Sequence, residues 1–184
     1  MENFDYRSAR TYAGQYGAII GLIWICSFAC FIGGLHYPVL SNFSLLIGLA
    51  SLFITIKLLN RFGRTVFPLK FSQATWMAIL VYMYASLLFA AAQYIYFRFI
   101  DNGFLVSTYE TLFQNPEYQK LLQQLMPGME QQETAIHEAI NMLYTITPIQ
   151  LTFNFLIYNV FLGFILSLPT GFFVSRKNKT TRNN

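Results

Sequence analysis

The residues best suited to chemistry in this sequence are two histidines and one glutamate, His36, Glu133 and His137. Glu133 and His137 stand four positions apart, a spacing that places both side chains on one face of a helix. A carboxylate and two imidazoles are ligands that Zn²⁺ accepts. No HExxH-type pattern accompanies them, however, and nothing in the sequence brings His36 beside His137. We therefore predict no catalytic or metal site, interpret Glu133 and His137 as a solvated helix pair, and keep the three residues as a speculative site outside the membrane.

A second group of candidates consists of polar side chains inside long apolar segments, namely Gln93, Asn154 and Asn159. Uncharged amides in such positions usually hydrogen-bond to neighbouring helices, and we expect that role for all three. Deep ionisable groups, the usual mark of an ion pathway, do not occur in these segments. The sequence also lacks a phosphate-binding glycine loop, a nucleophile elbow and a nucleotide fingerprint. We therefore predict a protein that is not an enzyme and that holds no cofactor.

Helices that cross a membrane must position these residues, because the composition excludes a soluble domain. Of the 184 residues, 55% are hydrophobic and 11% are charged, whereas a soluble domain carries about 25% charged residues. Uncharged runs extend from Thr11 to Ile56, from Phe71 to Phe97 and from Ala139 to Ser175. A spanning helix needs about 20 mainly apolar residues. The predicted fold class is therefore all-α, as a polytopic integral membrane protein.

The first uncharged run is too long for one crossing, and its interruption decides the number of spans. Gly33 and Gly34 weaken a helix end and Pro38 prevents its continuation, so this run forms two spans joined by a tight hairpin. Pro148 begins the last span, at a position that proline tolerates. We predict one membrane domain over residues 1–184 with four spans, at about 15–35, 43–60, 73–98 and 149–174.

The distribution of positive charge predicts the orientation of these spans. Most of the 12 Lys and Arg residues lie in the N-terminal tail, between the second and third spans, or in the C-terminal tail. Lys and Arg mark the cytoplasmic side, and four crossings place all three of these segments on one side. We predict cytoplasmic N- and C-termini. The basic tail beside the last span suits anionic lipid headgroups of the bilayer, and we expect no nucleic-acid partner.

The loop between the third and fourth spans, residues 101–147, is acidic and predicts a helical insertion on the non-cytoplasmic side. Asp101, Asn102 and Gly103 form a turn signal before an apolar segment at 104–113. Asn115 is a good N-cap for a helix at 116–126, and a second amphipathic helix runs from about 129 to Pro148. We predict that these helices cap the outer ends of the bundle or provide a docking surface for a partner.

Small residues at helical spacing indicate close helix contacts. Gly17 and Gly21 form a GxxxG pattern in the first span, and Gly163, Ser167 and Gly171 form a small-xxx-small row in the fourth. Such rows allow helix backbones to approach closely in lipid, where association depends on packing. The sequence leaves open whether these rows pack within the chain or join copies in a homo-oligomer.

Several segments together resemble a bacterial membrane family, found mainly in Bacteroidetes and catalogued as domain of unknown function 4199. They are "YGAIIGLI", "YFRFIDNGFL", the Gln/Glu/Met-rich helical pair and "TPIQLTFNFLIYNVFLGFILSLPTGFFVSRK". The resemblance implies an inner-membrane protein of four spans whose acidic insertion faces the periplasm. It carries no assigned activity, so no catalytic residue can be transferred. It also implies an association with a polyprenyl-phosphate glycosyltransferase and a dihydroorotase-like hydrolase.

These observations favour a non-catalytic accessory or scaffold protein of the bacterial inner membrane. Its partner would be a membrane enzyme such as a polyprenyl-phosphate glycosyltransferase of envelope biogenesis. One alternative is a small lipid-carrier translocator that acts as an oligomer, because four spans enclose little volume. A third interpretation is a periplasmic enzyme built on Glu133 and His137.

Overall fold

The computed structural model describes residues 6–66, 69–117, 120, 124 and 145–182. The regular elements within these ranges are helices: α1 (Tyr6–Gly34), α2 (Pro38–Thr65), α3 (Phe71–Phe99), α4 (Phe104–Gln114) and α7 (Pro148–Arg182). Among the described residues, four helices are long and apolar enough to cross a membrane, namely α1, α2, α3 and α7. The prediction of an all-α polytopic membrane fold is therefore confirmed.

Helices α1 and α2 form a tight hairpin, which only residues 35–37 connect. The backbone N–H of Tyr37 donates to the carbonyl of Gly33 at 2.9 Å and closes the turn. Tyr37 itself is extended, at φ −124° and ψ 98°, as the residue before a proline prefers. A Cβ atom placed on Gly34 would collide with Ser41 across the turn. The interruption of the first uncharged run thus falls where its glycines and Pro38 place it.

The spanning helices continue past the apolar segments that the sequence indicates. α1 begins ahead of Arg7, α2 continues past Arg64, and α7 runs to Arg182. A helix satisfies its own backbone hydrogen bonds, so it can extend from the hydrocarbon into the headgroup region without a break. Apolar composition therefore locates the centre of each helix, whereas the helix ends lie further out.

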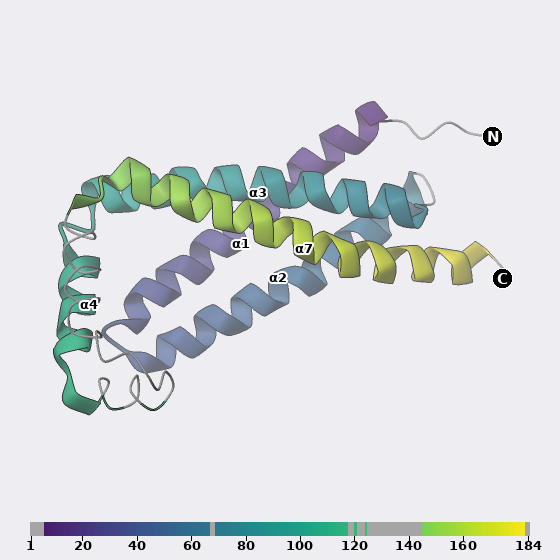
Figure 1. The fold of residues 1–184 in the computed structure, drawn as a ribbon. Helices are drawn as coiled ribbons and strands as arrows, with labels where there is room; N and C mark the ends of the chain where they lie inside the picture. The colour runs from purple at the N-terminus through teal and green to yellow at the C-terminus, as the bar shows by residue number, and fades with distance from the viewer. Residues whose placement is uncertain (1–5, 67–68, 118–119, 121–123, 125–144, 183–184) are drawn as a thin grey trace. The chain divides into compact units, whose positions relative to one another are not determined.

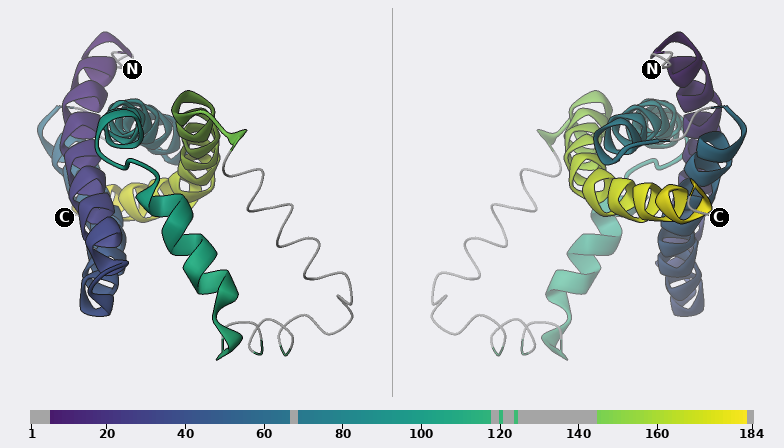
Figure 2. Two further views of the ribbon diagram at one scale, coloured as in Figure 1. Left: turned by 90° about the vertical axis from the view of Figure 1, so that its left-hand side faces the viewer. Right: turned by 90° about the vertical axis from the view of Figure 1, so that its right-hand side faces the viewer.

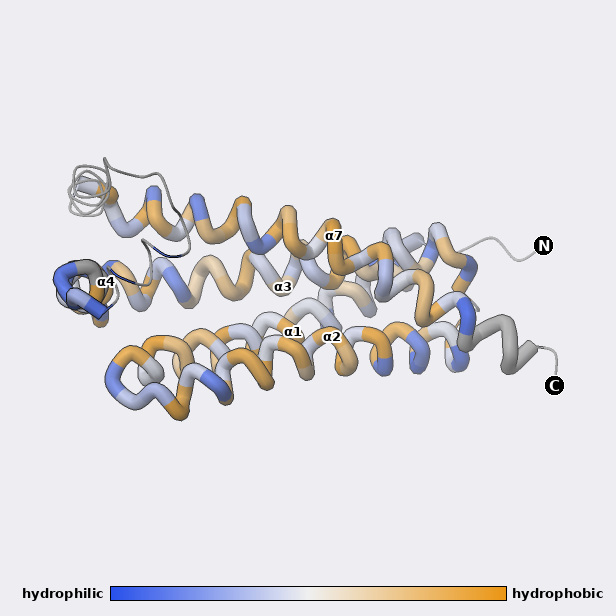
Figure 3. Tube along the Cα trace, turned by 60° about the horizontal axis from the view of Figure 1, so that its bottom comes forward, coloured by the Kyte–Doolittle hydropathy of each residue, from blue (hydrophilic) through white to orange (hydrophobic). Residues whose placement is uncertain are grey.

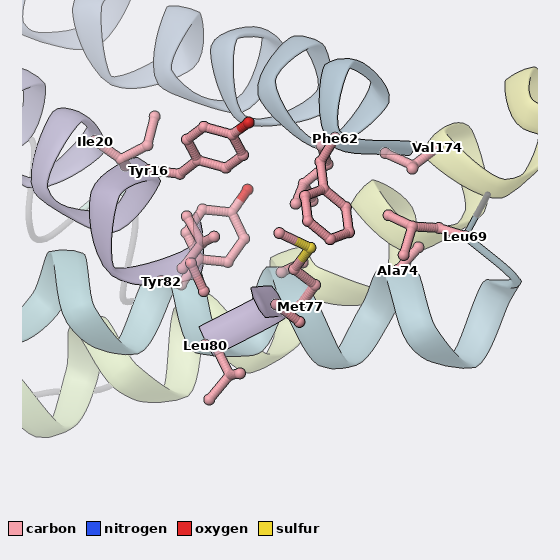
Figure 4. Close-up of a cluster of buried hydrophobic side chains, with 14 of the residues drawn as sticks. Tyr16, Ile20, Phe62, Leu69, Ala74, Met77, Leu80, Tyr82 and Val174 are labelled. Carbon is pink, nitrogen blue, oxygen red and sulfur yellow. The ribbon is translucent and has the colours of Figure 1, made fainter. Parts of the chain in front are cut away.

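The chain divides into two compact units, and the larger one joins Met1–Gln93 with Phe153–Asn184. Helix α3 is its most enclosed element. In the most apolar 18-residue stretch of α3, 56% of the residues are buried, against 11% to 22% in the corresponding stretches of the other three spanning helices. Figures 1 and 2 show α1, α2 and α7 arranged around α3. Buried apolar side chains of all four spanning helices form one cluster in this unit (Figure 4). Its members are Ala9, Ala13, Tyr16 and Ile20 of α1; Leu59 and Phe62 of α2; Leu69, which precedes α3; Ala74, Met77, Ala78, Leu80, Val81, Tyr82 and Ala85 of α3; and Val174 of α7.

Helix α7 stays helical through Pro169 and bends along its length, as Figure 2 shows. A proline inside a helix removes one backbone hydrogen bond and crowds the preceding turn, so it favours a bend. The hydroxyls of Ser167 and Thr170 beside it bond to the carbonyls of Phe164 and Leu166, at 2.6 and 2.8 Å. These side-chain bonds offer the backbone alternative partners where the regular ladder is interrupted.

Within the larger unit, the beginning of α1 and the end of α7 lie at the same end of the helices (Figure 1). Figure 3 shows apolar residues along the bodies of the helices and hydrophilic residues toward that end. Exposed basic side chains stand near the beginning of α1, as at Arg10, near the end of α2, as at Arg61, and toward the end of α7, as at Arg176. An even number of crossings produces this arrangement.

The second unit, Tyr94–Thr152, contains the end of α3, helix α4 and the beginning of α7. Asn102 and Gly103 adopt positive φ values of 45° and 81° and make the turn between α3 and α4. Asn115 Oδ1 accepts the backbone N–H of Glu117 at 2.9 Å, which is the capping bond expected of this residue. The helices predicted at 116–126 and from 129 onward lie largely outside the described residues.

Candidate functional site

The candidate site in the larger unit is a polar cluster centred on Tyr82 of α3, which is 1% exposed. The Tyr82 hydroxyl lies 3.2 Å from Thr170 Oγ1 of α7, and the Thr55 hydroxyl of α2 also approaches it. The indole ring of Trp24 on α1 stacks on the Tyr82 ring, with centroids 6.1 Å apart and planes 8° from parallel. Each of the four spanning helices therefore contributes to this group, which we call the Tyr82 cluster: Trp24, Ser51, Thr55, Tyr82 and Thr170.

The hydrogen bonds of the Tyr82 cluster have a defined direction. Trp24 Nε1 donates to Ser51 Oγ at 3.0 Å, and the Ser51 hydroxyl donates to the carbonyl of Gly48 at 2.6 Å. The Thr170 hydroxyl donates to Leu166, so the hydrogen in its bond with Tyr82 comes from the phenol. Each donor thus has an acceptor, which matters because an unpaired polar group in a hydrocarbon environment costs several kcal/mol.

The glycine row of α1 packs against α3. A Cβ atom on Gly17 would lie 2.6 Å from Tyr84 Cβ, and one on Gly21 would lie 3.1 Å from the carbonyl oxygen of Ala85. A methyl group on Gly17 would force the two backbones apart, and one on Gly21 would require its neighbours to shift by a few tenths of an ångström. In the structure, Gly17 and Gly21 therefore serve a contact within the chain.

The small-residue row of α7 packs against α3 in the same way. A Cβ atom on Gly163 would lie 2.8 Å from Tyr82 Cβ, and one on Gly171 would meet the side chain and the backbone of Thr75. Ser167, between them on this face, is also buried. These contacts set the antiparallel register of α3 and α7, and this register brings Thr170 opposite Tyr82.

The three amides singled out in the sequence do not share one environment. Gln93 of α3 is 2% exposed, and its Oε1 atom has no hydrogen-bond partner. Asn159 of α7 is half-buried, with Nδ2 also unpartnered, and it lies one turn before Gly163 on the face toward α3. Asn154 is exposed on another face of α7. Gln93 and Asn159 thus each carry a buried polar atom with unused hydrogen-bonding capacity, whereas Asn154 is exposed.

The speculative site of His36, Glu133 and His137 is only partly within the described residues. His36 is exposed in the turn between α1 and α2. Glu133 and His137 lie outside the described residues, so their distance from His36 is not defined. Among the residues that the structure does describe, no group of three or more His, Cys, Asp and Glu side chains could hold a metal ion.

Sequence reasoning missed the Tyr82 cluster because it counted amides and charged groups but not hydroxyls. The spacing of polar residues within two of the predicted spans indicated part of this cluster. Ser51 and Thr55 are one turn apart on the second span, and Tyr82, Ser86 and Gln93 follow each other at intervals of four and seven on the third. These spacings keep polar groups on one face of each helix, although they do not show which helices meet.

The chemistry available in the Tyr82 cluster is hydrogen bonding between neutral groups. Its phenol, indole and hydroxyls can join helices, because each bond links two different spans or anchors a side chain to its own backbone. The unpartnered atoms of Gln93 and Asn159 can in addition bond to water or to an uncharged polar group. The cluster therefore suits a fixed arrangement of helices.

Comparison with known proteins gives one family. Neither the curated proteins nor the solved structures yield a match. The family model described as "Protein of unknown function (DUF4199)" matches residues 15–176, a range that includes the Tyr82 cluster and both small-residue rows. The chain therefore belongs to the DUF4199 family of proteins of unknown function.

Proposed function

We propose that this protein is a non-catalytic accessory or scaffold protein of the bacterial inner membrane, with cytoplasmic termini and a periplasmic insertion at 101–147. The observation that carries the proposal is the contrast between the core and the surface of its larger unit. The core joins four helices through the neutral Tyr82 cluster and glycine contacts. The outer faces of α2 and α7 are strongly apolar, for example at Leu45, which is 66% exposed, and Tyr158, which is 69% exposed.

A bundle of this kind is suited to holding another membrane protein. Helix association in lipid depends on packing and interhelical hydrogen bonds, and a fixed bundle offers the same surface to a partner at all times. The family resemblance suggests a polyprenyl-phosphate glycosyltransferase of envelope biogenesis as the first partner to test. In this proposal the partner performs the chemistry and this chain anchors or orients it.

Site-directed photocrosslinking in the native membrane tests the scaffold proposal. A photoreactive residue is introduced at Phe161 of α7 or Leu45 of α2, both exposed, and at buried Val81 as the matched control. We expect Phe161 or Leu45 to capture a membrane enzyme, identified by mass spectrometry after purification in mild detergent, and Val81 to capture none. Adducts with lipid alone at both exposed positions would contradict the proposal.

A second function, translocation of a lipid carrier by an oligomer, is supported by the unpartnered atoms of Gln93 and Asn159. A polar headgroup that crosses the hydrocarbon needs hydrogen-bonding groups along its route. If the protein translocates a lipid carrier, replacing both Gln93 and Asn159 by Leu should abolish lipid transfer in reconstituted vesicles. The control Asn154→Leu, at an exposed position of α7, should leave transfer unchanged. Absence of transfer by the unaltered protein would remove this candidate.

A further inference from the structure

Helix α2 carries a continuous exposed stripe that neither the Tyr82 cluster nor the scaffold function uses. We call this face the α2 stripe, and its residues are Phe43, Leu46, Ala50, Phe53, Lys57, Arg61 and Arg64. They recur every three or four positions, which keeps them on one helix face, and all of them are exposed.

The α2 stripe changes character along its length. Its first four residues are apolar and its last three are cationic, and Figure 3 shows the corresponding change from hydrophobic to hydrophilic along α2. From Leu46 to Lys57 the helix rises about 16 Å, which is about half of a ~30 Å hydrocarbon core. The apolar residues that precede Lys57 therefore match one leaflet in length, and the cationic part lies at the level of the headgroups.

The cations of the α2 stripe have no acidic residue nearby in the sequence to neutralise them. No Asp or Glu occurs from residue 6 to residue 100. Arg61 acts electrostatically on the phenol of Tyr16, which is a neutral group. Lys57 and Arg61 are one turn apart, so their side chains can reach the same anion. Ammonium and guanidinium groups together form strong charge-assisted hydrogen bonds to phosphate oxygens.

We infer that the α2 stripe binds an anionic glycerophospholipid of the bilayer. Lys57 and Arg61 hold the phosphate, Arg64 adds positive charge at the headgroup, and an acyl chain lies along Phe53 and Leu46. The charge complementarity and the matching length select a lipid as the occupant, since a soluble anion would leave the apolar part of the stripe uncovered. This site is separate from the contacts by which the chain would hold a partner enzyme.

The test is lipid retention by the full-length protein, measured by native mass spectrometry in mild detergent with equal amounts of phosphatidylglycerol and phosphatidylcholine. We expect the unaltered chain to retain phosphatidylglycerol preferentially. The double variant Lys57→Gln/Arg61→Gln should bind phosphatidylglycerol about 30-fold more weakly, because each basic residue at an anionic surface contributes about fivefold. Its matched control, Arg10→Gln/Lys70→Gln, removes two exposed charges outside the stripe and should keep the preference.

Each result decides the question. Equal retention of the two lipids by the unaltered protein would overturn the proposal, as would equal losses in the two double variants, which would indicate a diffuse charge effect. The charge-conserving variant Lys57→Arg/Arg61→Lys should retain phosphatidylglycerol, and it decides the matter if the Gln variant does not fold. Displacement of phosphatidylglycerol by an isoprenoid phosphate monoester at equal concentration would contradict the assignment to a glycerophospholipid.

Discussion

At the scale of single residues, Gly14 and Gly17 show that a glycine in a membrane helix can lie either at a close helix contact or in open space. They lie one turn apart on α1, yet a Cβ atom on Gly17 would meet Tyr84 and Val81 of α3, whereas one on Gly14 would have nothing within 4 Å. Sequence alone does not distinguish them, because both lie in the same uncharged run, from Thr11 to Ile56. The difference arises only from the position of α3.

This contrast gives a stability prediction with its control on the same helix. Gly17→Ala should destabilise the protein by about 1–3 kcal/mol, because the added methyl group forces α1 and α3 apart. Gly14→Ala should leave stability unchanged or raise it by up to about 1 kcal/mol, since alanine is the better helix former. Thermal unfolding in detergent measures both, and equal effects of the two substitutions would contradict the α1–α3 contact.

At the scale of helices, the parts of the fold that local chemistry determines were predictable. Gly33, Gly34 and Pro38 interrupt the first uncharged run at the observed hairpin, and Asn115 makes the capping bond expected of it. The ends of the helices were less predictable, since a helix continues into the headgroup region after its apolar residues end. The bond between Tyr82 and Thr170 could not be predicted, because 88 residues separate them and only the α3–α7 register brings them together.

The hydrogen bond between Tyr82 and Thr170 should contribute to the free energy of unfolding of the protein. Tyr82→Phe removes the phenol that donates to Thr170 and leaves the ring in place, so it should lower stability by about 0.5–1.5 kcal/mol, the usual range for an interhelical hydrogen bond in a membrane protein. Tyr158→Phe, at an exposed position of α7, is the matched control and should have no effect. Unfolding of both variants in the same detergent is the measurement, and an unchanged Tyr82→Phe protein would contradict a stabilising role for the bond.

At the scale of the whole molecule, charge and helix count support the same topology. Four spanning helices return the chain to the side on which it began, and Figure 3 shows hydrophilic residues toward that end of the larger unit. The acidic stretch at 101–147 joins the third and fourth spans, so four crossings place it on the opposite side. The proposed scaffold function and the lipid site on α2 both depend on this arrangement, because it fixes which leaflet Lys57 and Arg61 face.

Cysteine accessibility tests this topology most directly. Cys26 and Cys30 are replaced by Ala, and a single cysteine is introduced as Asn115→Cys or as Lys70→Cys, both at exposed positions. An impermeant thiol reagent is then applied to intact and to lysed spheroplasts. The four-span topology predicts that Asn115→Cys reacts in intact cells and that Lys70→Cys reacts only after lysis. Reaction of Lys70→Cys in intact cells, or protection of Asn115→Cys until lysis, would contradict it.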